Sequence, residues 1–92
     1  MPQVFRVGLY VIYFWANEGK PLEPVHVHVS QGTPSENATK IWLTKHHKCL
    51  LCHNKSQIPL HVLRNITEII EARSDDVVGK WQQFFDESTF YC

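Results

Sequence analysis

The stretch Val25-His26-Val27-His28-Val29 decides the fold, because its apolar and polar side chains alternate strictly. A period of two residues is typical of a β-strand with one buried face. Successive side chains of a strand point to opposite sides, so we expect the three valines to face the core and the two histidines to face away from it. We refer to this segment as the histidine strand.

The segments that precede the histidine strand favour a hairpin and a loop. Two runs dense in β-branched and aromatic residues, 4–7 and 9–15, flank Gly8 and predict two antiparallel strands. The segment that follows them, 16–24, is rich in turn-forming residues and is typical of a loop.

The segments that follow the histidine strand predict further strands and then a change of period. A loop is expected over 31–37, and strands are expected over 38–43 and 48–52. Beyond these strands, Pro59 suits the first turn of a helix, because its missing N–H has no partner there in any case. The apolar residues that follow have the spacing of one helical stripe: Val62, Leu63, Ile66, Ile69 and Ile70.

A second helix is expected to begin near Ser74 and Asp75, whose side chains are suited to cap it. Asp75 and Asp76 also complement the positive end of the helix dipole. Its apolar stripe repeats the spacing of the first helix: Val77, Val78, Trp81, Phe84 and Phe85.

These elements predict an α+β fold. We expect an antiparallel, twisted sheet of four or five strands with two C-terminal helices packed on one face. A chain of 92 residues is long enough for one domain, so we assign 1–92 to a single domain with strands in 1–54 and helices in 58–87.

The sheet is expected to carry a polar side that the two helices leave open. Alternation in the histidine strand puts His26, His28 and Ser30 on this side, and alternation in the next strand puts Lys40 and Trp42 beside them. This side therefore combines imidazoles, one ammonium group and one indole.

The charge balance argues against a protein that binds polyanions through a global field. Lys and Arg together number 9, as do Asp and Glu, so the formal net charge is zero. Nucleic-acid binding usually requires a basic excess, so it is possible here but not favoured. A low net charge also favours self-association.

The cysteine count and the N-terminal residues favour a cytoplasmic protein. Three cysteines cannot all pair within one chain, so we expect reduced thiols. The first residues lack the basic stretch and apolar core of a signal peptide, and no apolar run approaches the ~18 residues of a membrane span. We expect no membrane association.

Three stretches of the chain resemble a known family. They are Met1-Pro2-Gln3-Val4-Phe5-Arg6-Val7-Gly8, Glu23-Pro24-Val25-His26-Val27-His28-Val29 and Trp81-Gln82-Gln83-Phe84-Phe85. Together they resemble a family of small bacterial proteins known as domain of unknown function 4160. The common family form has a second proline where this chain has Val25, a departure that lengthens the strand.

The resemblance implies a sheet-plus-helices fold in a bacterial cytosolic protein. It also implies frequent pairing of the gene with that of a small partner, as in a toxin–antitoxin-like module. The family has no established reaction, so the resemblance assigns no catalytic residue.

His26 and His28 have three open interpretations. Their backbones lie about 6–7 Å apart on one strand, so the two rings are spaced to share a metal or to act as an acid/base pair on a phosphodiester. They are equally compatible with half-exposed strand residues that pack on Trp42 and on the aromatic residues of the hairpin. Glu18 and Glu23 border the strand and are candidates to orient an imidazole or to complete a metal shell.

A metal or haem centre is not expected. Cys49-Leu50-Leu51-Cys52-His53 matches the attachment pattern of c-type haem, and its two cysteines also have the spacing of a zinc half-site. In a strand, however, positions three apart point to opposite faces, so the two thiols cannot chelate one ion. We predict no stoichiometric zinc or haem and no other cofactor.

The remaining histidines are expected to be solvated. His46 and His47 lie in a turn flanked by lysines, and His61 lies in the first turn of a helix. We assign no function to these three side chains.

The favoured function is a regulatory module that binds a small protein encoded by a neighbouring gene. The alternative is a small ribonuclease-like toxin that uses His26 and His28 for acid/base chemistry, so the sequence leaves open whether the chain is an enzyme. The predicted binding residues, listed by position, are Glu23, Ser30, Lys40 and Trp42. Because the two rings are expected to be exposed, alanine at His26 or His28 should cost about 0.5 kcal/mol or less.

Overall fold

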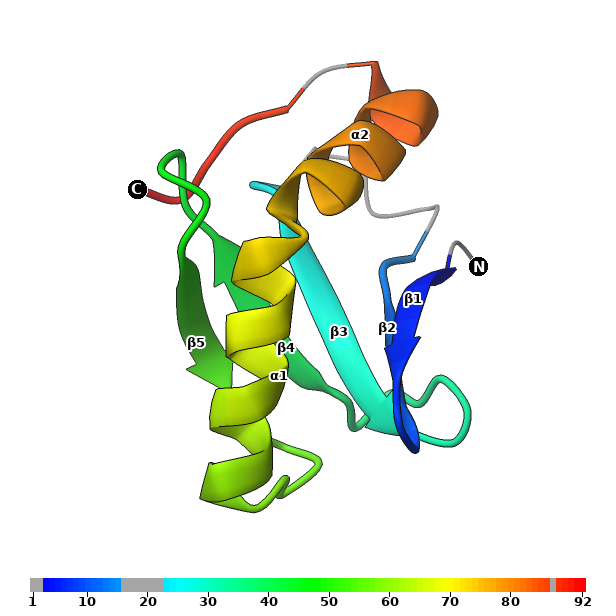
Figure 1. Cartoon of the computed structure of the whole chain (residues 1–92). Helices are drawn as coiled ribbons and strands as arrows, with labels where there is room; N and C mark the ends of the chain where they lie inside the picture. The colour runs from blue at the N-terminus through cyan, green and yellow to red at the C-terminus, as the bar shows by residue number, and fades with distance from the viewer. Residues whose placement is uncertain (1–2, 16–22, 87) are drawn as a thin grey trace.

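The computed structural model describes residues 3–15, 23–86 and 88–92, and Figure 1 shows the arrangement of their helices and strands. Five strands are followed by two helices. In chain order the elements are β1 (Gln3–Val7), β2 (Tyr10–Tyr13), β3 (His26–Gln31), β4 (Thr39–Leu43), β5 (Cys49–His53), α1 (Leu60–Ala72) and α2 (Ser74–Phe85).

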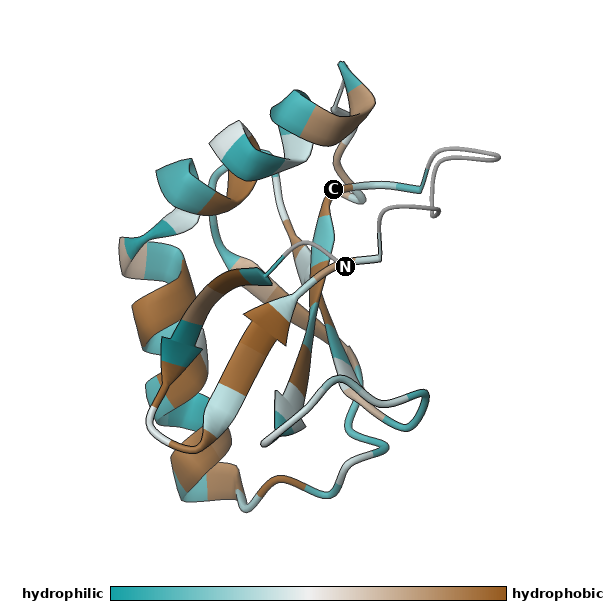
Figure 2. Ribbon diagram, turned by 90° about the vertical axis from the view of Figure 1, so that its right-hand side faces the viewer, coloured by the Kyte–Doolittle hydropathy of each residue, from teal (hydrophilic) through white to brown (hydrophobic). Residues whose placement is uncertain are grey.

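The five strands form one antiparallel sheet in the order β1-β2-β3-β4-β5. Each strand therefore pairs with its neighbours in the sequence. Both helices lie on one side of this sheet, as the view along its edge shows (Figure 2). The structure thus confirms the predicted α+β fold of an antiparallel sheet with two C-terminal helices.

The predicted hairpin and loops form largely as expected. Gly8 has a φ of 57°, a left-handed conformation that glycine adopts without steric cost, and it makes the turn between β1 and β2. Gly32, with a φ of 78°, is the first residue after β3, so the loop predicted over 31–37 begins one residue later than expected. Most of the predicted loop over 16–24 lies outside the described residues, as does Glu18.

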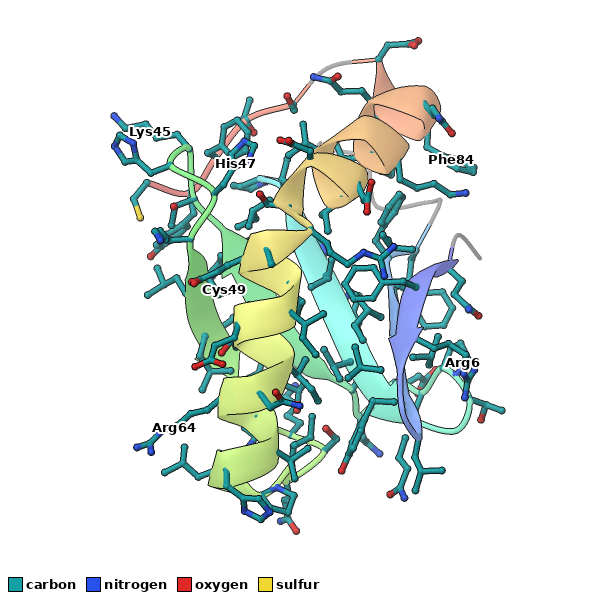
Figure 3. The ribbon with its side chains drawn as sticks, viewed as in Figure 1. Arg6, Lys45, His47, Cys49, Arg64 and Phe84 are labelled. Carbon is teal, nitrogen blue, oxygen red and sulfur yellow. The ribbon has the colours of Figure 1, made fainter. Side chains whose placement is uncertain are left out.

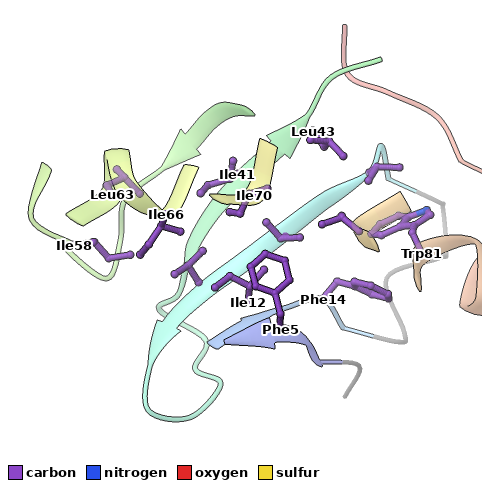
Figure 4. Packing of buried hydrophobic residues seen from close by; sticks show 14 residues of the cluster. Phe5, Ile12, Phe14, Ile41, Leu43, Ile58, Leu63, Ile66, Ile70 and Trp81 are labelled. Atoms are coloured by element: carbon purple, nitrogen blue, oxygen red, sulfur yellow. The ribbon is translucent and has the colours of Figure 1, made fainter. Parts of the chain in front are cut away.

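The main core lies between the helices and the valine side of β3. Val25, Val27 and Val29 are almost completely buried, as the alternation of the histidine strand predicts. They pack with the buried residues of α1 and α2, among them Ile66, Ile70, Val77 and Trp81. Figure 4 shows this cluster, with Trp81 beside Phe14 at one end.

The start of α2 differs from its prediction. Ser74 is the first helical residue and makes no capping hydrogen bond, because its Oγ is 2.7 Å from Nδ1 of His47. Arg73 holds the capping position, and its side chain does not cap the helix either. Asp75 and Asp76 lie in the first turn, where they complement the helix dipole. The capping role expected for Ser74 and Asp75 was therefore wrong.

The other side of the sheet has a small core of its own. Val11, Tyr13 and Ala38 are buried there, with Trp15 packed against them. The Tyr13 hydroxyl is 2.9 Å from Oγ of Ser30 and accepts a hydrogen bond from the backbone N–H of Ser35 at 3.1 Å. This second core orders the loop after β3 against the sheet.

The C-terminal segment, residues 88–92, returns to the sheet after α2 (Figure 1). The Val25 N–H donates to the carbonyl of Thr89 at 2.8 Å, and the Lys45 N–H donates to the carbonyl of Cys92 at 2.9 Å. We call this segment the C-terminal strap. No helix in the described part of the chain is long and apolar enough to cross a membrane.

Candidate functional site

The polar side of the sheet is organised as two rows of side chains that run across the strands. Residues directly opposite each other in antiparallel strands project to the same side and lie close together. In the first row Tyr13 pairs with His28, His28 with Lys40, and Lys40 with His53. In the second row His26 pairs with Trp42, and Trp42 pairs with Leu50. The seven residues of these two rows define the polar sheet face.

His26 is completely buried, at 0% exposure, which contradicts the expectation of an exposed ring. Its ring makes edge contacts with Trp42 at 5.5 Å and with Trp81 at 5.3 Å between centroids. Nδ1 donates a hydrogen bond to the carbonyl of Pro24 at 2.9 Å, since a carbonyl can only accept. Trp81 belongs to α2, so a helix contacts His26 even though alternation alone places His26 on the side of the sheet that faces away from the helices.

His28 is half-buried between aromatic side chains and its neighbour in the strand. Its ring centroid lies 5.5 Å from that of Tyr13, 6.4 Å from that of Trp15 and 5.1 Å from that of His26. The structure therefore brings the two predicted histidines into ring contact. It leaves only His28 of the two partly open to solvent.

Lys40 holds the centre of the first row. Its Nζ forms an ion pair with Oε1 of Glu23 at 2.8 Å and lies 4.4 Å from the ring centroid of Trp42. The side chain of Lys40 is only 16% exposed, so both interactions are less screened than at an open surface. The predicted residues Glu23, Lys40 and Trp42 are thus brought together, with Glu23 bound to the ammonium group.

Trp42 is covered by an aromatic residue of the C-terminal strap. The rings of Trp42 and Tyr91 stack at 5.1 Å with an interplanar angle of 8°. Tyr91 stays 58% exposed, and Leu50, the cross-strand neighbour of Trp42, stays 40% exposed. We call Trp42, Tyr91 and Leu50 the aromatic patch.

Ser30 has a structural partner rather than a place on the open surface. It is buried at 3% exposure, and its hydroxyl is hydrogen-bonded to the hydroxyl of Tyr13. Its predicted position on the same side of the sheet as the histidines is therefore right. Its burial, however, removes it from direct contact with a ligand.

His53 is a member of the polar sheet face that sequence reasoning missed. A β-bulge between Lys40 and Ile41 in the β4–β5 ladder brings His53 opposite Lys40. Desolvation lowers the pKa of His53 below its ordinary value of 6.5, and the charges of Lys55, Lys40 and His28 lower this pKa further. Period-two alternation continued past Cys52 would place His53 on the helix side with Cys49 and Leu51, so only the bulge brings it to the polar sheet face.

The cysteines are distributed in a way that separates the two thiols of the Cys-x-x-Cys spacing. Cys49 is half-buried against α1, where its Sγ donates to the carbonyl of Thr67 at 3.6 Å, whereas Cys52 is exposed. Burial, together with the nearby carboxylate of Glu71, raises the pKa of the Cys49 thiol to about 12. Within residues 3–15, 23–86 and 88–92, no three His, Cys, Asp or Glu side chains are grouped to hold a metal ion.

The remaining histidines divide into two classes. His46 and His61 are exposed, as expected. His47 is not simply solvated, because its Nδ1 approaches Oγ of Ser74 at 2.7 Å and Oδ1 of Asp75 at 3.4 Å. It therefore joins the turn between β4 and β5 to the start of α2.

The geometry limits what this face can do chemically. The predicted pair of His26 and His28 offers one accessible imidazole rather than two, because His26 is sealed between Trp42 and Trp81. Catalysis by two imidazoles would need His28 and His53, which lie two strands apart with Lys40 between them. Binding needs no such rearrangement, because Tyr91 and Leu50 of the aromatic patch are already exposed.

Comparison with known proteins gives one match. A family model described as "Domain of unknown function (DUF4160)" matches residues 10–82, a span that contains both rows of the polar sheet face. No curated protein and no solved structure shows significant similarity to the chain.

Proposed function

The chain belongs to the DUF4160 family, and on this premise we propose that it is a cytoplasmic regulatory module that binds a small protein partner. The partner is the product of a neighbouring gene, in the manner of a toxin–antitoxin-like pair.

The observation that carries the proposal is the aromatic patch. Tyr91 lies flat on Trp42, and the exposed Leu50 extends the apolar surface next to them. Tyrosine and tryptophan are enriched at the centres of protein interfaces, because they offer a large apolar area together with a polar group. A stacked pair of this kind is typical of a site that a partner covers.

The surroundings of the patch hold it in one conformation. Lys40 is fixed between Glu23 and the Trp42 ring, and the ring of the buried His26 makes an edge contact with the same indole. A surface that is already ordered loses less conformational entropy when a partner binds. This order favours recognition without a large rearrangement.

The charge of the chain supports a protein partner over a nucleic acid. Positive and negative side chains balance at 9 each, so no overall field attracts phosphates. Within the polar sheet face, the one lysine is already paired with a carboxylate. The resemblance to proteins whose genes occur in pairs agrees with this preference.

One observation favours a second candidate, a small ribonuclease-like toxin. The lowered pKa of His53 keeps its imidazole neutral near pH 7, the state required of a general base. Lys40 would then stabilise the charge of a phosphodiester, and His28 would act as the acid in place of the buried His26. This candidate requires Lys40 to exchange Glu23 for substrate.

Co-expression with the product of the neighbouring gene separates the two candidates. The tagged chain should copurify with that product in a fixed ratio, and Tyr91→Ala should abolish copurification. Phe84→Ala serves as the matched control, because Phe84 is an aromatic residue of similar exposure on α2. Growth arrest that His28→Ala and His53→Ala both relieve, without copurification, would contradict the binding proposal and support the nuclease.

A further inference from the structure

Strand β5 forms one edge of the sheet, and its apolar side chains are exposed on both sides. Leu50 projects to the polar sheet face and is 40% exposed. Leu51, which pairs with Ile41, projects to the helix side and is 46% exposed. An edge strand with exposed apolar side chains is a template on which another strand can pair.

The backbone of β5 also presents unused hydrogen-bonding groups. The Cys49 N–H donates to Oε2 of Glu71 at 2.8 Å, so it points away from β4. Backbone groups of successive strand residues alternate in direction, which puts the N–H and C=O of Leu51 on the same outer edge as those of Cys49. Among the described residues, no loop backbone or side chain bonds these two groups of Leu51.

One end of this edge is protected and the rest is not. Glu71 extends from α1, which packs beside β5, and occupies the Cys49 donor. Natural sheets often block their edges with such carboxylates, with lysines or with bulges. The protection by Glu71 stops before Leu51, so a pairing position remains in the middle of the strand.

The charges around the edge are mainly positive. The exposed Lys48 precedes β5, and the exposed Lys55 follows it. Arg64 projects from α1 toward the side of the molecule on which β5 lies (Figure 3). Lys45, in the turn before β5, adds a further exposed positive charge.

This charge pattern disfavours a second copy of the chain as the occupant. If two β5 strands paired antiparallel about Leu51, Lys48 of one copy would lie next to Lys55 of the other. Like charges at neighbouring cross-strand positions are destabilising. Carboxylates at both ends of an added strand would instead be attracted to the lysines.

We propose that β5 accepts an antiparallel strand from a protein partner, namely an extended segment of alternating apolar residues with carboxylates at both ends. The added strand would bond to the outer groups of Leu51 and cover both leucines, a known mode of peptide recognition. The inference rests on the proposed function only in that the occupant is a protein. Its surface, the outer edge of β5, meets the aromatic patch at Leu50 but does not include the Trp42–Tyr91 stack.

The test is a fluorescence-anisotropy titration of the full chain with labelled nine-residue peptides. The probe has alternating Val and Thr in its centre and two carboxylates at each end, and a second peptide carries lysines at the same positions. We expect the acidic peptide to bind at least tenfold more tightly. The double variant Lys48→Glu, Lys55→Glu should reverse this preference. Equal binding of both peptides, or no binding of either, would overturn the inference.

Variants at Leu51 test the strand pairing itself. Leu51→Pro removes an outward N–H without removing a bond to β4, so peptide binding should be lost while the sheet is kept. If this variant fails to fold, Leu51→Lys provides the same test, because edge lysines oppose pairing. Leu60→Lys is the matched control, since Leu60 is an exposed leucine on α1. Binding that survives both Leu51 variants would contradict the proposal.

The failure of this inference can be told apart from that of the proposed function. If Tyr91→Ala abolishes the complex with the neighbouring gene product and Leu51→Lys leaves this complex intact, the proposed function is supported and the strand pairing is contradicted. If the peptide binds in a way that depends on Leu51 but no such complex forms, the strand pairing is supported and the proposed function is contradicted.

Discussion

His26→Ala is expected to destabilise the fold strongly, although a histidine in an alternating strand would ordinarily tolerate this change. The ring is completely buried between Trp42, Trp81 and His28, with centroid distances of 5.1 to 5.5 Å. Its Nδ1–H also satisfies the carbonyl of Pro24. Alanine removes the contacts of three neighbouring rings and leaves a cavity at the end of the main core.

The magnitude follows from these two losses. Removing a buried Phe or Trp ring costs about 3–5 kcal/mol, and the smaller imidazole scales this down. The lost hydrogen bond adds about 1 kcal/mol, so the free energy of unfolding should fall by roughly 2–4 kcal/mol. For a domain of this size, this loss lowers Tm by roughly 10–25 °C.

Urea denaturation followed by circular dichroism measures the change, with Cm and the m-value fitted together. His61→Ala is the matched control, because His61 is exposed and should shift stability by no more than about 0.5 kcal/mol. His26→Phe keeps the ring and removes the donor, so it should cost about 1 kcal/mol. A loss of under about 0.5 kcal/mol in His26→Ala would refute the packing described for this ring.

Three further predictions concern other contacts. Cys49 should react with Ellman's reagent at pH 8 far more slowly than the two exposed cysteines, and Glu71→Gln should increase the reaction rate of Cys49. Equal rates for all three thiols would contradict the raised pKa of Cys49. His53 should titrate below 6.5 by NMR. Because the fold favours its neutral form, the free energy of unfolding should fall as the pH drops below 6.5, and His53→Gln should reduce this pH dependence. The same pH dependence in the wild type and in His53→Gln would contradict the lowered pKa. Ser74→Ala should cost about 1 kcal/mol in the wild-type chain and nearly nothing in a His47→Ala background, whereas equal costs would indicate that Ser74 acts as a helix cap.

Most of the fold was predictable because it depends on local periodicity. The valines of the histidine strand alternate with polar residues, and their near-complete burial in the structure follows from that alternation. Leu63, Ile66 and Ile70 have helical spacing, and all three are buried in α1. Patterns of this kind are set by the geometry of one element, so no knowledge of its neighbours is required.

The environment of His26 was not predictable, because it depends on residues far away in the sequence. Alternation correctly puts His26 on the polar side of its strand, but it cannot say that Trp81 reaches this ring from α2. Nor does any periodicity mark the C-terminal strap, which has no regular secondary structure yet brings Tyr91 onto Trp42. These contacts decide which predicted residues are available at the surface.

The candidate site was likewise predictable only in part. Lys40 and Trp42 lie where alternation places them, beside His26 and His28. His53 joins them through a β-bulge, which changes the register by one residue and leaves no clear signal in the sequence. A pattern of period two cannot be continued through such an irregularity.

Calorimetric titration of the purified chain with the product of its neighbouring gene measures whether the aromatic patch binds a protein partner. We expect one binding site per chain and an affinity that Tyr91→Ala weakens at least tenfold, because that change removes the exposed half of the Trp42–Tyr91 stack. Phe84→Ala should leave the affinity within about twofold of the wild type. Absence of binding heat at several temperatures, or equal affinities for the wild type and Tyr91→Ala, would contradict the claim that the aromatic patch binds a protein partner.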